Sequence, residues 1–175
     1  IKMFKKGEKM DEQIKLEDED FTSMGSINHS IVQAKMTGML LNDERFTPAI
    51  ELSLDISQID LSQFKLKVKE ELKPDISLYQ GRRELCSPDD ILKMTEMPLL
   101  VIEVLSPKQT IDEILAKFKA YFALGIKSCW LVTPAIRAIA IYSQPSTFTT
   151  FGMNDTEAID NVVGIHLPIQ KVFGW

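Results

Sequence analysis

The chain has 175 residues, enough for one domain with a sizeable buried core, and its net charge of −5 argues against tight, indiscriminate binding to nucleic acid. Its longest apolar run, residues 98–105, is interrupted by Glu103 and is far shorter than the roughly 20 residues of a membrane span, so no membrane association is expected. The charged first thirty residues lack the apolar core of a signal peptide, and Cys86 and Cys129 show no zinc-type spacing. A cytoplasmic protein with reduced thiols is expected.

The domain organisation is expected to be simple. Residues 1–26 read as a charged segment, in which lysines precede an acidic run at 17–20, and this pattern is typical of a solvated terminus without a recognition role. Residues 27–175 are expected to form a single domain. No internal repeat or low-complexity linker indicates a second one.

The first half of this domain is expected to contain one helix and several extended segments. Residues 27–41 carry apolar side chains at helical spacing, with Ser26 or Asn28 as candidate N-caps. Apolar and polar residues alternate over 46–56, which predicts a strand. Similar alternation predicts extended segments at 64–68 and 75–79.

The second half has clearer patterns. Residues 99–105 are apolar on both faces, as in a central strand covered on both sides, with Glu103 as the one charged residue. A helix is predicted from Thr110, where Glu113 has capping-box spacing, to Gly125. Further strands are predicted at 128–133, 136–143 and 148–151, followed by an apolar tail at 162–175 that packs back on the core.

Glu103 is the first candidate for a functional residue, because an unpaired charge buried in an apolar strand costs several kcal/mol. It could be a structural acid near a strand end that pairs with a lysine. Alternatively, Asp75, which follows Pro74 in another extended segment, could point into the same cleft. Two carboxylates, together with water and phosphate oxygens, form the octahedral oxygen cage that Mg²⁺ prefers. The acidic pair therefore predicts a metal site.

A longer series of motifs surrounds these acids. It comprises Lys73-Pro74-Asp75-Ile76, Pro98 to Val101, Ile102-Glu103-Val104-Leu105-Ser106-Pro107, Asp112, Lys117, Tyr121, Gly125, Trp130-Leu131-Val132, Leu167-Pro168-Ile169 and Phe173, with His29 at the start of the first helix. The series resembles the Uma-two family of restriction-endonuclease-like proteins, a group abundant in cyanobacteria. The resemblance spans about residues 28–173, and the segment at 103–107 followed by Lys117 and Tyr121 is its most specific part.

The resemblance implies an α/β fold of the PD-(D/E)xK nuclease type, a restriction-endonuclease-like core with a mixed β-sheet flanked by helices. It also implies an endonuclease that hydrolyses phosphodiester bonds of nucleic acid, with DNA as the expected substrate and Mg²⁺ or Mn²⁺ as the cofactor. Asp75 and Glu103 would be the metal ligands, and the backbone carbonyl of Val104 a further one. By analogy with nucleases that act as dimers, a homodimer is a further expectation.

The chain departs from the PD-(D/E)xK motif at its lysine. The motif places a lysine two residues after the second acid, where this chain has Leu105. As in the family generally, we expect the catalytic lysine to have moved to the following helix, at Lys117. Tyr121 lies four residues further on and neighbours it on that helix. The alternative is that Lys117 is a surface lysine and Tyr121 a core-edge aromatic with a solvated hydroxyl.

Other candidates carry less weight. His29 could line the cleft or carry a proton, and otherwise it caps or packs. Glu51, on the polar face of its strand, could join the acidic set. Asp112 fits a partner of the helix dipole better than a metal ligand, and His166 is expected to be structural.

Three classes of function follow. The leading hypothesis is a Mg²⁺-dependent endonuclease. The second is a catalytically silent protein of nuclease fold that acts as a nucleic-acid-binding or regulatory module, which the net acidity and the missing strand lysine favour. A two-carboxylate glycosidase is disfavoured, because no aromatic cluster adjoins either acid.

Overall fold

The computed structural model describes residues 25–66, 71–85 and 89–174. The expected charged segment at 1–26 lies almost entirely outside the described residues, as do Cys86 and residues 67–68 of the expected extended segment at 64–68. Within the described ranges, no helix has the length and apolar character needed to cross a membrane. Cys129 is a buried free thiol.

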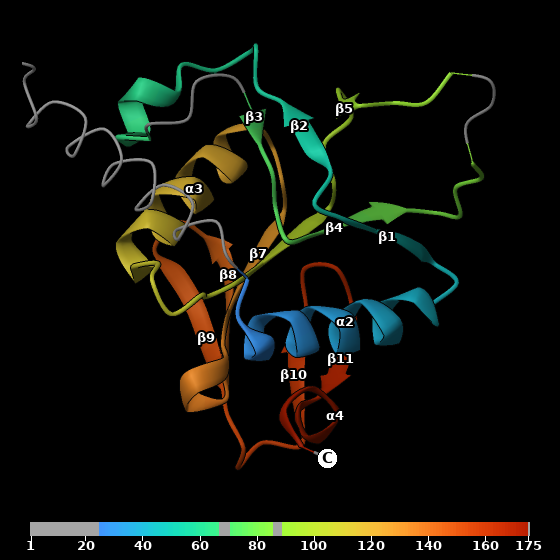
Figure 1. Cartoon of the computed structure of the whole chain (residues 1–175), viewed down its shortest axis with the longest axis vertical. Helices are drawn as coiled ribbons and strands as arrows, with labels where there is room; N and C mark the ends of the chain where they lie inside the picture. The colour runs from blue at the N-terminus through green and yellow to red at the C-terminus, as the bar shows by residue number, and fades with distance from the viewer. Residues whose placement is uncertain (1–24, 67–70, 86–88, 175) are drawn as a thin grey trace, which may run out of the picture.

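A mixed β-sheet forms the centre of the fold (Figure 1). Its six strands lie in the order β1 (Phe46–Ile50), β4 (Ile76–Gln80), β6 (Leu100–Val104), β7 (Ser128–Thr133), β8 (Ala138–Gln144) and β9 (Thr147–Phe151). Strands β6 and β7 are parallel, and the other neighbours pair antiparallel. This arrangement confirms the expected mixed sheet.

Helices and two small sheets cover the central sheet on both faces. The helical elements are α2 (Ile27–Leu41), η1 (Leu61–Phe64), α3 (Ile111–Ala123), η2 (Pro134–Ile136) and α4 (Ile169–Phe173). The small sheets are β10 (Glu157–Asp160) with β11 (Ile165–Pro168), and β3 (Glu71–Leu72) with β2 (Ser53–Asp55) and β5 (Lys93–Met94). Helices α2 and α3 lie on opposite sides of the central strands (Figure 1).

Strand β6 separates two apolar clusters. Ile102 packs in the cluster that contains α2, α4 and the β10–β11 hairpin, whereas Val101 packs in the cluster that contains α3. All five residues of β6 are buried. The prediction of a central strand covered on both sides is therefore confirmed.

The two long helices follow their local signals. Helix α2 spans the predicted 27–41, and the Ser26 hydroxyl accepts a hydrogen bond from the His29 backbone N–H. Helix α3 begins with a complete capping box between Thr110 and Glu113. Beyond its end Gly125 has φ of +91°, a backbone conformation that glycine adopts without strain.

Two predicted strands are wrong in part. The strand expected over 46–56 breaks at Glu51, where φ is +49°, so that β1 joins the central sheet and β2 a separate one. Phe64 belongs to the 3-10 helix η1, and Lys65 after it has φ of +59°. Alternation of apolar and polar residues indicates extended backbone but does not show where the chain changes direction. Strand β10, which was not predicted, has only four residues, too few for a clear alternating pattern.

The expected packing of the C-terminal tail is confirmed, and one buried acid fastens it. Leu167 and Val172 are buried. Asp160 in β10 accepts hydrogen bonds on Oδ2 from Ser128 Oγ at 2.5 Å and Trp130 Nε1 at 2.7 Å. Both donors lie on β7, so this carboxylate ties the β10–β11 hairpin to the central sheet.

Replacing Asp160 by alanine should destabilise the fold, because it leaves the buried Ser128 and Trp130 donors without an acceptor. We expect the free energy of unfolding to fall by about 2–6 kcal/mol, since each of the two unsatisfied buried donors costs about 1–3 kcal/mol. Urea denaturation followed by tryptophan fluorescence measures this. Asp155→Ala, which removes an exposed acceptor, is the control. Equal, small losses for both variants would contradict the structural role of Asp160.

Candidate active site

The two predicted acids lie at the same end of a pair of neighbouring strands, Asp75 just before β4 and Glu103 within β6. Ile76, the residue after Asp75, is paired with Ile102, the residue before Glu103, and the two carboxyls are close enough for the charge of Asp75 to act on Glu103. Asp75 Oδ2 accepts a hydrogen bond of 2.6 Å from the backbone N–H of Val104. The expected juxtaposition of the two acids is therefore present.

Glu103 is held by two side chains of α3. Its carboxyl is 2% exposed and accepts a 2.6 Å hydrogen bond from the Tyr121 hydroxyl on Oε1. Lys117 Nζ lies 3.3 Å from Oε1 and 3.2 Å from Oε2. The lysine thus makes the contact expected of one that replaces the missing strand lysine. Tyr121 is fully buried, so the expectation of a solvated hydroxyl is wrong.

Burial controls the charge of this carboxyl. Removal from water raises the pKa of Glu103, the Lys117 ammonium opposes that rise, and the negative charge of Asp75 adds to it. Burial and the neighbouring Glu103 also hold the pKa of Tyr121 well above its usual range, so its hydroxyl stays protonated and donates. Burial and Asp75 therefore favour the protonated form of Glu103, whereas Lys117 favours its ionised form.

Helix α2 holds the second acid. His29 Nε2 lies 3.1 Å from Asp75 Oδ2, and this hydrogen bond raises the pKa of His29 against the opposing effect of burial. One turn further along α2, Gln33 Nε2 donates to the Asp75 carbonyl at 2.9 Å. His29 thus lines the site as expected. The sequence patterns did not indicate Gln33 as a site residue. Its spacing of four residues from His29, which sets both on one face of the helix, is the signal that could have identified it.

Glu51 lies beside the pair rather than within it. Its backbone N–H donates to the Asp75 carbonyl at 3.2 Å, and its negative charge contributes to the raised pKa of His29. Its own carboxylate is 54% exposed and pairs with Lys73 Nζ at 3.3 Å. Membership of Glu51 in the acidic set stays a prediction.

The remaining acidic and histidine candidates have separate places. Asp112 is exposed in the first turn of α3, where a negative charge favours the helix dipole. His166 is exposed on β11, and its Nδ1 lies 3.2 Å from Glu157 Oε2. Neither contacts Asp75 or Glu103 in the recorded hydrogen bonds and ion pairs of the described residues.

The oxygen atoms at this site suit a hard cation that takes few ligands from the protein. Among the residues that the structure describes, no group of three or more His, Cys, Asp and Glu side chains could hold a metal ion. Two carboxylates remain, those of Asp75 and Glu103, which lie close enough to interact electrostatically. Mg²⁺ usually binds through one or two carboxylates and completes its six oxygens with water and substrate phosphates. Asp75 and Glu103 are therefore suitable ligands for Mg²⁺.

Comparison with known proteins identifies the class. The fold resembles a solved structure described as "a putative nuclease belonging to DUF820 from Anabaena variabilis ATCC 29413", with a TM-score of 0.67 and 19% identity over 87% of this chain and 83% of that one. This likeness confirms the restriction-endonuclease-like fold. The Uma2 family, described as "Putative restriction endonuclease", matches residues 6–170. The chain belongs to the Uma2 (Uma-two) family. A comparison with curated proteins finds no match.

Removing the Lys117 charge should destabilise the protein only while Glu103 is ionised. For Lys117→Met we expect the free energy of unfolding to fall by about 1–3 kcal/mol, because a buried carboxylate loses a charged partner. In the double variant Glu103→Gln/Lys117→Met most of this loss should be recovered. Urea denaturation of the four proteins gives the coupling free energy. A coupling free energy of zero would mean that the contact contributes nothing to stability.

Proposed function

We propose that this protein is a Mg²⁺-dependent endonuclease that hydrolyses phosphodiester bonds of nucleic acid, with DNA as the substrate. The observation that carries the proposal is the closeness of Asp75 and Glu103 at one end of the β4–β6 pair, with the Lys117 ammonium on Glu103. Membership of the Uma2 family supports a nuclease rather than a glycosidase. Mn²⁺, which also takes oxygen ligands, would substitute for Mg²⁺.

Each side chain has a role in this proposal. Asp75, Glu103 and the Val104 carbonyl would hold the cation, which when bound polarises the phosphate and lowers the pKa of the attacking water. Lys117, at 3.2 Å from Glu103, would orient that water and stabilise negative charge that develops on the phosphate. Tyr121 fixes one oxygen of Glu103 by its hydrogen bond. His29 holds Asp75 and could carry a proton.

One observation favours the second candidate, a catalytically silent module that binds nucleic acid or regulates. Glu103 already has a charged and a neutral donor, Lys117 and Tyr121, so its buried carboxyl is stabilised without a metal. A structural role for the same contacts would produce the same distances. Only activity separates the two candidates.

Glu103→Gln should abolish cleavage of plasmid DNA in the presence of Mg²⁺ and leave the protein folded or slightly more stable. The substitution removes a metal ligand's charge without changing its shape, and it relieves a buried negative charge. Agarose electrophoresis and calorimetry measure the two effects. Asp112→Asn removes an exposed charge from α3 and should cleave as the wild type does. A wild-type protein that cleaves neither DNA nor RNA with Mg²⁺ or Mn²⁺ would support the silent module.

Lys117→Met should lower the cleavage rate by about 10²-fold or more, the scale of losing one electrostatic donor in an active site. The variant keeps most of the side-chain length and removes the charge. Rates are compared per folded protein, under conditions where circular dichroism shows that the variant is folded. The matched control is Lys119→Met, two residues along α3 on its exposed side. Wild-type cleavage by Lys117→Met would show that the lysine is structural.

A further inference from the structure

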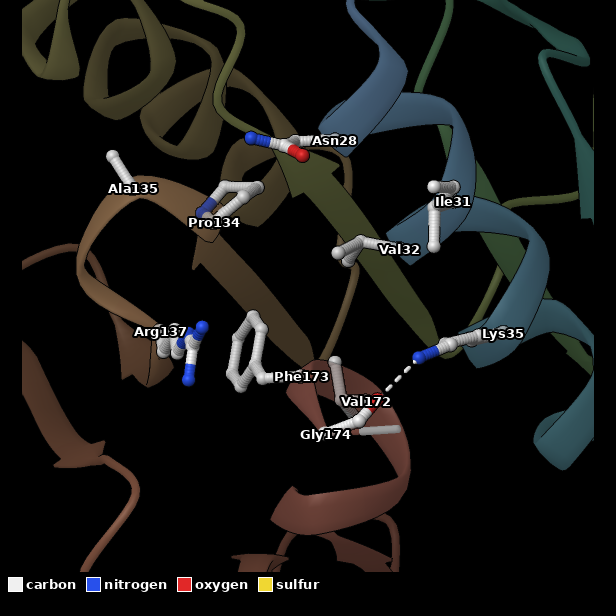
Figure 2. A pocket seen from close by; sticks show the side chains of 10 residues that line it. All are labelled: Asn28, Ile31, Val32, Lys35, Pro134, Ala135, Arg137, Val172, Phe173 and Gly174. Atoms are coloured by element: carbon white, nitrogen blue, oxygen red, sulfur yellow. Dashed lines mark hydrogen bonds between the residues drawn. The ribbon is translucent and has the colours of Figure 1, made fainter.

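A second polar feature lies next to the candidate active site. A pocket of about 310 Å³ opens between α2, η2 and α4 (Figure 2). Its charged lining side chains are Lys35 and Arg137, and the amide of Asn28 adds a polar group. Ile31, Pro134 and Phe173 supply apolar surface. Among the described residues, none that lines this pocket is acidic, so its charge is opposite to that of the nearby acidic pair.

The pocket and the acidic pair share one edge of the sheet. Asn28 directly precedes His29, which contacts Asp75, so that adjacent faces of α2 border the two sites. Pro134 directly follows β7, whose end lies beside the end of β6. Figure 2 shows both strands running toward Asn28 and Pro134. The pocket therefore lies at the end of the sheet that also carries the acidic pair.

The cations of the pocket have hydrogen-bonding capacity for an anion. Lys35 Nζ donates one hydrogen bond, of 2.6 Å, to the Gly174 carbonyl, and an ammonium has three donors. Arg137 is exposed, and no ion pair with it is recorded among the described residues. Its backbone has φ of +52°, a left-handed conformation that glycine would adopt with less strain. This conformation ends the 3-10 helix η2 at Arg137.

We propose that this pocket binds a nucleotide of the substrate strand beside the scissile phosphodiester. Lys35 and Arg137 bind its phosphate, Asn28 hydrogen-bonds the sugar or base, and Phe173 and Pro134 make the apolar contact. The volume is at the lower end of the range for ligand pockets, about 300–1,000 Å³, and suits a single nucleotide better than a larger ligand. The inference rests on the proposed nucleic-acid substrate, but it does not require turnover.

The test measures binding without cleavage. Fluorescence anisotropy follows a labelled DNA duplex binding to the wild-type protein in EDTA at several salt concentrations. Arg137→Gln should weaken binding about tenfold and reduce the slope of log K against log salt by about 0.9, the value for one lost phosphate contact. Ile31→Glu, at a 44% exposed position of α2, should also weaken binding, because it brings a negative charge into the pocket. Lys127→Gln, at the opposite end of β7, is the control and should bind normally.

Other results would overturn the pocket assignment. These are unchanged affinity and salt slope for Arg137→Gln, equal weakening by Lys127→Gln, or no DNA binding by the wild type. The pocket and the endonuclease fail separately. Binding that depends on Arg137 in a protein that does not cleave with Mg²⁺ would retain the pocket and reject the endonuclease. Mg²⁺-dependent cleavage by a protein whose DNA affinity does not depend on Arg137 would retain the endonuclease and reject the pocket.

Discussion

The buried carboxyl of Glu103 is the constraint on which the candidate site depends. Strand β6 is covered on both faces, so this group is almost entirely removed from bulk water and needs donors from the protein. Helix α3 supplies them one turn apart, as Lys117 and Tyr121. The capping box at Thr110 fixes where α3 begins, and the four-residue spacing of Lys117 and Tyr121 sets both on the side of the helix that faces this carboxyl.

The other acid is supported from the opposite layer. Helix α2 packs on the face of the sheet away from α3, yet its first turns reach the sheet edge, where His29 and Gln33 contact Asp75. The Val104 N–H completes this support from within the sheet. Each carboxylate is thus positioned by a different helix. The pairing of β4 with β6 sets the distance between the acids, and the dense packing of both apolar clusters holds each helix against the sheet.

The sequence predicts those parts of the structure that depend on short-range physics. The buried strand around Glu103, the capped helix α3 and the spacing of Lys117 and Tyr121 are all readable from local periodicity. The break at Glu51 is not, because its alternating pattern continues through a residue with positive φ. The contact of Gln33 with the Asp75 carbonyl joins residues 42 positions apart, and only tertiary packing reveals it.

The net charge of −5 would argue strongly against nucleic-acid binding only if that charge were spread evenly over the protein surface. A polyanion responds to the local potential, and clefts concentrate the field of the charges that line them. Lys35 and Arg137 line a pocket whose recorded lining has no acid, at the sheet edge that also carries the acidic pair. Negative charge elsewhere on such a protein would reduce nonspecific binding without weakening attraction at this edge. An acidic protein with a locally basic pocket is therefore compatible with a nuclease that binds its substrate chiefly next to the two carboxylates for which we propose a catalytic role.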